Sequence, residues 1–206
     1  PTHEGPAVGI DLGLSALVTL STGEKVEPPR HYRTAQAKLR RQQRRASRRK
    51  RHSQRQKKAY RLVAKTHEKI ANQRKTFAHA LSHRLTDTYS LIAVEDLNIL
   101  ALAKSNLAKS VTDAAWSQLL MFLTYKAESA GGKVVKVDPR GTSQFCSGCG
   151  CRGPHKDLSV RVHRCPECGL VLDRDHNAAL NILHRALTPP VAGGQALTYP
   201  LRESVA

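Results

Sequence analysis

Two pairs of cysteines constrain this chain more than any other feature of its sequence. Each pair has the form Cys-x-x-Cys: Cys146 with Cys149, and, after an insert of fifteen residues, Cys165 with Cys168. Such a pair makes a tight turn that directs both sulfur atoms at one ion, and two turns supply the four thiolates of a zinc ribbon. Four thiolates leave no open coordination position, so the predicted Zn²⁺ is structural. The alternatives are a disulfide or buried thiols, and the spare thiol of Cys151 could replace Cys149 only by widening the turn.

The positive charge of the chain is concentrated in one segment. The 206 residues carry a net charge of +18, and residues 33–75 hold eighteen Lys and Arg against a single acid, Glu68. A nearly neutral body with one basic arm suits a polyanion, and nucleic acid is the usual one. A solvated basic run and attraction to anionic lipid are the alternatives. The residues that we expect to contact nucleic acid are Arg40, Arg41, Arg44, Arg45, Arg48, Arg49, Lys50 and Arg51.

The basic segment is predicted to be helical, because no Gly or Pro occurs between residues 30 and 130. Thr34 is the expected N-cap. A straight helix over residues 34–84 would be about 75 Å long, which is too long for a compact domain of this size. We therefore expect a hairpin that turns at residues 48–53 and whose second arm docks on the body through an apolar stripe, with coiled-coil dimerisation as the alternative. The stripe consists of Leu62, Ile70, Phe77, Leu81 and Leu85.

Short apolar segments on either side of the hairpin predict the strands of a mixed sheet. An amphipathic helix is expected from Trp116 to Ala127, with Trp116 packed in the core and base stacking as its alternative role. Helices on the faces of a mixed sheet are typical of the α/β class. The predicted strands comprise residues 7–13, 14–20, 90–94 and 133–138.

Three carboxylates stand at the ends of these elements. Asp11 interrupts an apolar strand, Glu95 directly follows the strand at residues 90–94, and Asp175 lies at the start of a helix rich in Ala and Leu. A buried carboxylate without a partner is costly, so a metal ion or a cation is expected beside Asp11. Two Asp and one Glu together would form an oxygen site suited to Mg²⁺ or Mn²⁺, and two such ions can hydrolyse a phosphodiester. A hydrogen-bonded turn for Asp11 and a helix cap for Asp175 are the local alternatives.

Residues 9–13, residues 94–99, the two Cys-x-x-Cys pairs and residues 173–179 occur in an order that resembles the transposon-encoded TnpB (OrfB) family. That family consists of RNA-guided DNA nucleases related to type V CRISPR effectors. The resemblance implies an α/β, RNase H-like (RuvC) mixed sheet with helices, a basic helical hairpin insertion and an inserted zinc ribbon. The implied parts are a RuvC-like core at 7–140 with the insertion at 31–88, a ribbon at 141–170, a last RuvC motif and helix at 171–187, and a flexible tail at 188–206.

The resemblance also implies the chemistry and the partners. Asp11, Glu95 and Asp175 match the catalytic ligands of Mg²⁺ or Mn²⁺, and Asp173 is left as a capping or supporting residue. The implied function is a metal-dependent DNA endonuclease with DNA and a guide RNA as partners. Family members carry a long N-terminal lobe that holds the guide, whereas little precedes Val8 here, so such a lobe or a separate recognition subunit is expected. A non-catalytic DNA- or RNA-binding zinc-ribbon module, or a remnant that needs a partner, is the alternative.

The expected cellular location of the chain rests on two kinds of segment that its sequence lacks. No apolar stretch approaches the roughly 20 residues that span a bilayer, and no segment resembles a signal peptide. We expect a cytoplasmic, nucleoid-associated protein without a membrane partner. The chain begins with Pro1 rather than Met, and we expect it to be part of something longer.

Overall fold

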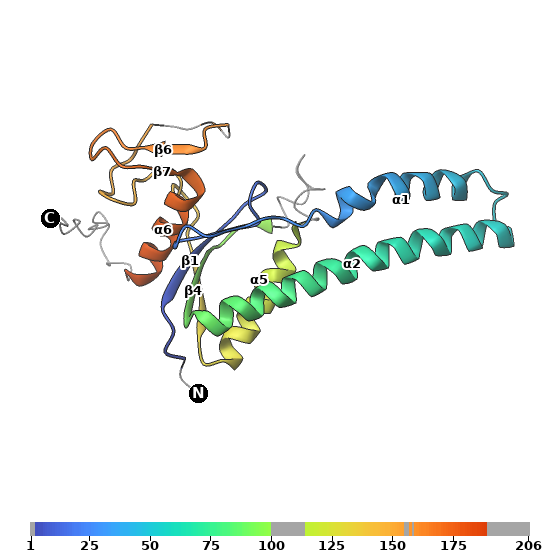
Figure 1. The fold of residues 1–206 in the computed structure, drawn as a ribbon, viewed down its shortest axis with the longest axis horizontal. Helices are drawn as coiled ribbons and strands as arrows, with labels where there is room; N and C mark the ends of the chain where they lie inside the picture. Colours follow the sequence, from blue (N-terminus) through green and yellow to red (C-terminus); the bar gives the residue numbers. More distant parts are fainter. Residues whose placement is uncertain (1–2, 100–113, 155–156, 158, 189–206) are drawn as a thin grey trace.

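Among the residues that the computed structural model describes (3–99, 114–154, 157 and 159–188), five strands form one mixed sheet (Figure 1). Their order is β3-β2-β1-β4-β5. Strands β1, β4 and β5 run parallel, with β5 at one edge, whereas β2 and β3 are antiparallel additions that end at the other edge. The strands are β1 (Ala7–Leu12), β2 (Val18–Leu20), β3 (Lys25–Val26), β4 (Leu91–Glu95) and β5 (Lys133–Val137).

Helices cover both faces of this sheet, which confirms the α/β class (Figure 1). Alternate residues of a strand point to opposite faces. Val8 and Ile10 of β1 and Ile92 of β4 therefore share one core with α2 and α5. On the opposite face, Ala93 packs with Ile182 of α6. The helices of these layers are α2 (Gln54–Thr88), α5 (Trp116–Ser129) and α6 (Arg174–Leu187).

The backbone of α6 lies directly on β1 at Gly9. A Cβ atom built on Gly9 would stand 2.1 Å from the carbonyl oxygen of Ala179 and 2.7 Å from the backbone nitrogen of Leu183. No side chain fits into that space, so only glycine lets the helix and the strand approach this closely. Gly9 thereby fixes the depth at which α6 sits on the sheet.

The basic segment forms a helical hairpin that projects from the body (Figure 1). Its first arm, α1 (His31–Ser47), ends directly before the expected turn at residues 48–53. The second arm, α2, begins at Gln54, and its N-cap Ser53 accepts a hydrogen bond from the backbone N–H of Gln56. The prediction of Thr34 as N-cap is wrong. The helix starts at His31, directly after Arg30, whose backbone is left-handed. The Thr34 hydroxyl donates a hydrogen bond to the Arg30 carbonyl oxygen at 3.2 Å.

The predicted apolar stripe docks the second arm, with two corrections. Leu81 and Leu85 are buried in the main core, and Phe77 packs against it. Further out, Ile70 packs against the first arm rather than the body. Leu62 is 49% exposed, because its neighbour along the chain occupies the inward position towards α1.

Two of the predicted strands are shorter in the structure. The strand expected at 7–13 ends at Leu12, and the strand expected at 14–20 is reduced to Val18–Leu20, because residues 13–17 form a bend. The tail expected at 188–206 lies, beyond residue 188, outside the described residues. No helix in the described part of the chain combines the length and the apolar character needed to cross a membrane.

Replacing Gly9 with Ala tests whether the contact between α6 and β1 supports the fold. The new methyl group would collide with backbone atoms, which cannot move aside without shifting α6. We expect Gly9→Ala to lower the free energy of unfolding by about 3 kcal/mol, at the upper end of the usual overpacking cost, as measured by urea denaturation.

Gly153→Ala is the matched control, because its Cβ would lie 3.3 Å from the nearest atom, the Gln144 carbonyl oxygen. We expect a change below about 1 kcal/mol there. Equal stability of the Gly9→Ala variant and the unsubstituted chain would show that α6 does not depend on this contact.

Candidate active site and metal centre

Asp11 and Glu95 lie side by side at the carboxyl ends of two parallel strands. The last recorded pair between β1 and β4 is Ile10 with Val94, and each acid is the next residue along its strand. Asp11 is two residues after Gly9 and therefore points to the same face, the one covered by α6. The sheet thus places both carboxylates beneath the start of that helix.

The third acid, Asp175, comes from the first turn of α6. It precedes Ala179, the residue that touches Gly9, by four positions, which is about one helical turn. The N-cap is Asp173, whose carboxylate accepts hydrogen bonds from the backbone N–H groups of Asp175 and His176 at 3.1 Å each. The capping role considered for Asp173 is therefore confirmed, and the carboxylate of Asp175 is not used as the cap.

One cavity of about 570 Å³ collects the three acids. Asp11, Glu95 and Asp175 all line it, although their carboxylate oxygens do not all lie within 4.8 Å of one another. Its other walls come from the loop after β1, the loop after β5, the ribbon and α5. Among these residues are Gly13, Ser15, Leu97, Trp116, Pro139, Thr142, Ser143, Arg161, Arg174 and Ala178.

The electrostatics of this cavity favour a cation. Burial, and then the charges of Glu95 and Asp175, raise the pKa of Asp11 to about 8. Burial also raises the pKa of Glu95, and a hydrogen bond from the Thr142 hydroxyl acts in the opposite direction. Carboxylates pressed together in a low dielectric resist ionisation unless a positive charge joins them. The oxygen donors of this set are those that Mg²⁺ and Mn²⁺ prefer, so the residues present fit such an ion.

Two arginines bring positive charge to the rim of the cavity. A guanidinium nitrogen of Arg161, in the ribbon, lies 4.0 Å from a carboxylate oxygen of Asp175. Arg174 acts on Asp11 and lowers its pKa, against the larger effect of burial. Its side chain is anchored by donating to the carbonyl oxygen of Asp157 at 2.7 Å. Sequence reasoning missed both arginines, because nothing in the sequence showed that the ribbon folds back over the acids.

Sequence reasoning also missed the polar residues that hold the ribbon against α6. Asn177 donates to the Phe145 carbonyl oxygen at 2.8 Å and accepts from the Ser147 N–H at 3.0 Å. Asn181 donates to the carbonyl oxygens of Thr142 and Phe145 at 2.8 Å each. Both asparagines are almost fully buried. Two asparagines four residues apart in the otherwise apolar stretch 177–183 were the available signal, since buried amides need partners.

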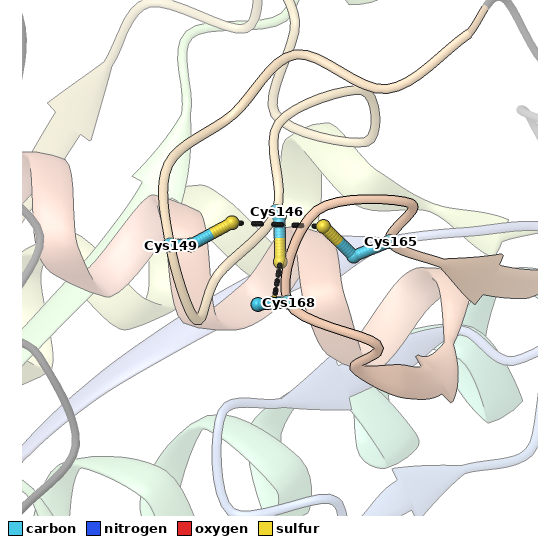
Figure 2. A group of neighbouring side chains, drawn as sticks. All are labelled: Cys146, Cys149, Cys165 and Cys168. Atoms are coloured by element: carbon cyan, nitrogen blue, oxygen red, sulfur yellow. Dashed lines mark hydrogen bonds between the residues drawn. The ribbon is translucent and has the colours of Figure 1, made fainter.

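The four predicted cysteines converge on one point (Figure 2). All four sulfur atoms lie within 4.8 Å of one another, and the pairs Cys146 with Cys168 and Cys149 with Cys165 are each 3.6 Å apart. In a tetrahedral site with zinc–sulfur bonds of about 2.3 Å, two sulfurs are about 3.8 Å apart. All five cysteines are free thiols, so the disulfide alternative is not adopted. The cluster is compatible with a structural zinc ion.

The ribbon built on these cysteines is a small two-stranded sheet that leads into α6. Its strands are β6 (Val162–Arg164) and β7 (Val171–Asp173), and β7 ends on the N-cap of α6. Asp173 also pairs with Lys25 of β3 at 2.8 Å. The cysteine cluster therefore stands beside the element that carries Asp175.

The predicted nucleic-acid contacts divide into two groups. Six of them line a single cavity of about 800 Å³ along α1. Lys50 and Arg51, at the hairpin turn, are exposed and do not line it. Steps of four residues align the six arginines in two adjacent rows, which run along α1 and continue past its end at Ser47 to Arg48 and Arg49. The six are Arg40, Arg41, Arg44, Arg45, Arg48 and Arg49.

Trp116 has its expected place in the core and an unexpected one in the cavity. It is 5% exposed and packs with Leu119 and Leu123. Its indole also lines the acidic cavity, and its N–H has no hydrogen-bond partner within the described parts of the chain. A ring this deeply buried does not offer a face for base stacking.

Comparison with known proteins identifies the family. A family profile described as a probable transposase (OrfB_IS605) matches residues 1–106, which are 106 of the 206 residues. The chain belongs to the TnpB (OrfB) family. A second profile, described as the Cas12f1-like TNB domain, matches residues 116–182 of this family member. The resemblance seen in the sequence is confirmed.

Several curated relatives of this TnpB-family chain are known. One from Streptomyces pristinaespiralis, provisionally named an RNA-guided DNA endonuclease, is 42% identical over 202 residues, covering 96% of this chain and 49% of the relative. InsQ of Escherichia coli (strain K12), with the same provisional name, is 34% identical over 200 residues, covering 89% and 50%. The CRISPR-associated endodeoxyribonuclease Cas12f1 of Sulfoacidibacillus thermotolerans is 34% identical over 125 residues, covering 58% and 29%. The chain spans about half the length of the first two relatives.

Two solved structures share the fold. A cryo-EM structure of a Cas12f1–sgRNA–target DNA complex aligns with a TM-score of 0.63 and 17% identity, covering 86% of this chain and 49% of that one. A cryo-EM structure of a CRISPR–Cas12f ternary complex aligns with a TM-score of 0.66 and 19% identity, covering 89% and 40%. At these identities the similarity shows a common fold.

Replacing Asp11 with Asn tests whether the three acids lower the stability of the fold when no metal is bound. Burial, and then the charges of Glu95 and Asp175, disfavour the ionised form of Asp11, so in EDTA we expect Asp11→Asn to raise the stability by about 1 kcal/mol or more, or about 2–4 °C in Tm for a chain of this size. Addition of Mn²⁺ should raise the Tm of the unsubstituted chain and leave that of the variant nearly unchanged. Differential scanning calorimetry measures both effects.

Asp96→Asn is the matched control, since Asp96 directly follows Glu95 but is exposed and pairs with Lys136 at 3.5 Å. We expect its stability to change by less than about 0.5 kcal/mol and its response to Mn²⁺ to be kept. An Asp11→Asn variant that is less stable in EDTA than the unsubstituted chain would contradict a repulsive cluster.

Proposed function

We propose that this chain is the catalytic part of an RNA-guided DNA endonuclease, with an RNase H-like (RuvC) core and an inserted, structural zinc ribbon. One observation carries the proposal: three acids from distant parts of the sequence, Asp11, Glu95 and Asp175, line a single cavity on one face of the sheet. Membership of the TnpB family supports it. The division into a core at 7–140, a ribbon at 141–170 and a last motif at 171–187 stays a prediction.

The acids take the role of metal ligands in this proposal. When bound, Mg²⁺ or Mn²⁺ activates water and stabilises the charge that develops on the leaving 3′ oxygen of a phosphodiester. Asp11 and Glu95 are held by neighbouring strands, so their separation is set by the sheet. Asp175 lies in the first turn of a helix that Asp173 already caps, so its carboxylate is not needed for the cap.

Other residues of the cavity prepare this site. The Thr142 hydroxyl donates to Glu95 and fixes the orientation of that carboxylate, and Asn181 in turn holds the carbonyl group of Thr142. The guanidinium of Arg161 is more than half exposed, so it can turn from Asp175 towards a phosphate oxygen. The chain thus supplies ligands, an orienting hydroxyl and a cation for the phosphate within one cavity.

The hairpin supplies the electrostatic attraction for nucleic acid. From Arg40 to Arg48 the row of arginines extends for about 12 Å along the helix axis. Duplex DNA presents one phosphate charge per about 1.7 Å of axis, or about seven over that length. The arginine groove on α1 is therefore proposed to bind the nucleic-acid backbone rather than base edges. The relatives and the solved complexes support DNA and a guide RNA as the partners.

A non-catalytic nucleic-acid-binding module is the second candidate, because the arginine groove and the ribbon would serve it equally well. It does not explain why three carboxylates line one cavity, where they would repel both one another and a polyanion. The nuclease is therefore the better supported function.

A cleavage assay separates the two functions. We expect the chain, with Mg²⁺ or Mn²⁺, to cut single-stranded DNA, and Asp11→Ala or Glu95→Ala to reduce the rate by at least about 100-fold, since each removes a ligand from the metal site. Binding to the same DNA, measured by fluorescence anisotropy, should change little in these variants.

A triple variant in which Arg40, Arg44 and Arg48 are each replaced by Gln is the converse control, because it alters the proposed binding groove and leaves the acids intact. Binding should weaken and depend less steeply on salt, because fewer phosphates are neutralised. If neither this chain nor its fusion to the part of the Streptomyces relative that it does not cover, supplied with guide RNA, cuts DNA, the binding module replaces the nuclease. Metal-dependent cutting that survives Asp11→Ala would likewise contradict the assigned site.

A further inference from the structure

The fifth cysteine of the chain lies against the zinc cluster. The sulfur of Cys151 is 3.3 Å from that of Cys165, closer than the 3.6 Å that separates Cys149 from Cys165. The sulfurs of Cys149 and Cys151 therefore both lie near the Cys165 sulfur, at distances close to the separation of two sulfurs in a tetrahedral zinc site. Cys151 does not belong to the set whose sulfurs all lie within 4.8 Å of one another, so the other four cysteines form the resting site.

We propose that Cys151 is an interchangeable zinc ligand that takes the place of Cys149, so that the ribbon has two alternative sets of four thiolates. The second set is Cys146, Cys151, Cys165 and Cys168. This second ligand set does not depend on the proposed nuclease function.

The backbone already makes the wider turn that this exchange needs. The N–H of Cys146 donates to the Cys151 carbonyl oxygen at 2.9 Å, next to an antiparallel bridge between Phe145 and Arg152. Cys146 and Cys151 therefore lie across from each other at the base of one turn. Gly150 has a positive φ of 73° and donates to the Cys146 carbonyl oxygen at 2.9 Å. Four residues separate Cys146 from Cys151, and ligand spacings of two to four residues are usual in zinc sites.

The exchange balances without any further reactant. The zinc–sulfur bond of Cys149 breaks as that of Cys151 forms, and the proton that leaves the Cys151 thiol is taken up by the Cys149 thiolate. The number of coordinating thiolates and the net charge of the site are the same before and after. In the resting site the thiol of Cys151 is placed to donate a hydrogen bond to the Cys165 sulfur.

The exchange also preserves the contacts on which the acidic cavity depends. Cys146, Cys165 and Cys168 remain ligands in both sets, so the turn that contains Phe145 and Ser147 keeps its place. Those two residues hold Asn177 of α6. Loss or damage of the Cys149 thiol would therefore leave the ribbon metal-bound.

Zinc content and affinity test the proposal directly. We measure zinc in the purified chain by mass spectrometry, affinity by competition with a chromophoric chelator, and ligand geometry by the absorption of the cobalt-substituted protein. Cys149→Ser is expected to keep full zinc content and a four-thiolate cobalt spectrum. Cys149→Ser combined with Cys151→Ser is expected to lower the affinity by at least about 100-fold, as losing about a quarter of the binding free energy of a four-ligand site implies.

Cys168→Ser is the matched control, since it removes one ligand from the second turn and leaves Cys151 intact. The expected loss equals that of the double variant. Cys151→Ser alone should keep full zinc content, which shows that serine at this position does not prevent the ribbon from folding. The proposal is wrong if Cys149→Ser loses zinc as completely as Cys168→Ser, or if adding Cys151→Ser to Cys149→Ser has no effect.

Discussion

The contact between the backbones of β1 and α6 at Gly9 is the constraint on which the acidic cavity depends. It brings the helix close enough that Asp175, one turn before the contact, reaches the strand end that carries Asp11. The parallel pairing of β1 with β4 then adds Glu95 in the same register. Burial of these charges is unfavourable in itself, as the raised pKa of Asp11 shows, so packing energy elsewhere in the fold must hold them together.

Packing of the apolar residues supplies that free energy. The same packing explains which helices and strands could be predicted from the sequence. The continuous apolar runs of β1 and β4 and the periodic Leu81/Leu85 stripe of α2 were readable in the sequence, and they form the main core. The bend at 13–17 and the exposure of Leu62 were not readable, because both depend on which neighbour occupies the inward position. Local propensity gives the type of an element, and tertiary contacts decide its ends.

The candidate site shows the same division. Asp11, Glu95 and the zinc cysteines could be singled out, because an acid in or directly after an apolar run and a Cys-x-x-Cys pair are unusual in sequence. Thr142 and Arg161 could not, since each is an ordinary residue in a loop, and the spacing of Asn177 and Asn181 indicated buried amides without indicating their partners. Their roles arise only when the ribbon folds back on α6, through hydrogen bonds between parts of the chain about 40 residues apart. Polar networks of this kind have no periodicity to detect.

The central claim is that the three acids form one metal site, and anomalous X-ray scattering from a crystal soaked in Mn²⁺ tests it most directly. The account predicts one or two manganese peaks in the cavity between Asp11, Glu95 and Asp175, with carboxylate oxygens as ligands. The same soak of an Asp11→Asn crystal should show weaker peaks or none. Manganese bound elsewhere on the molecule, with this cavity free of it in the unsubstituted chain, would contradict the account.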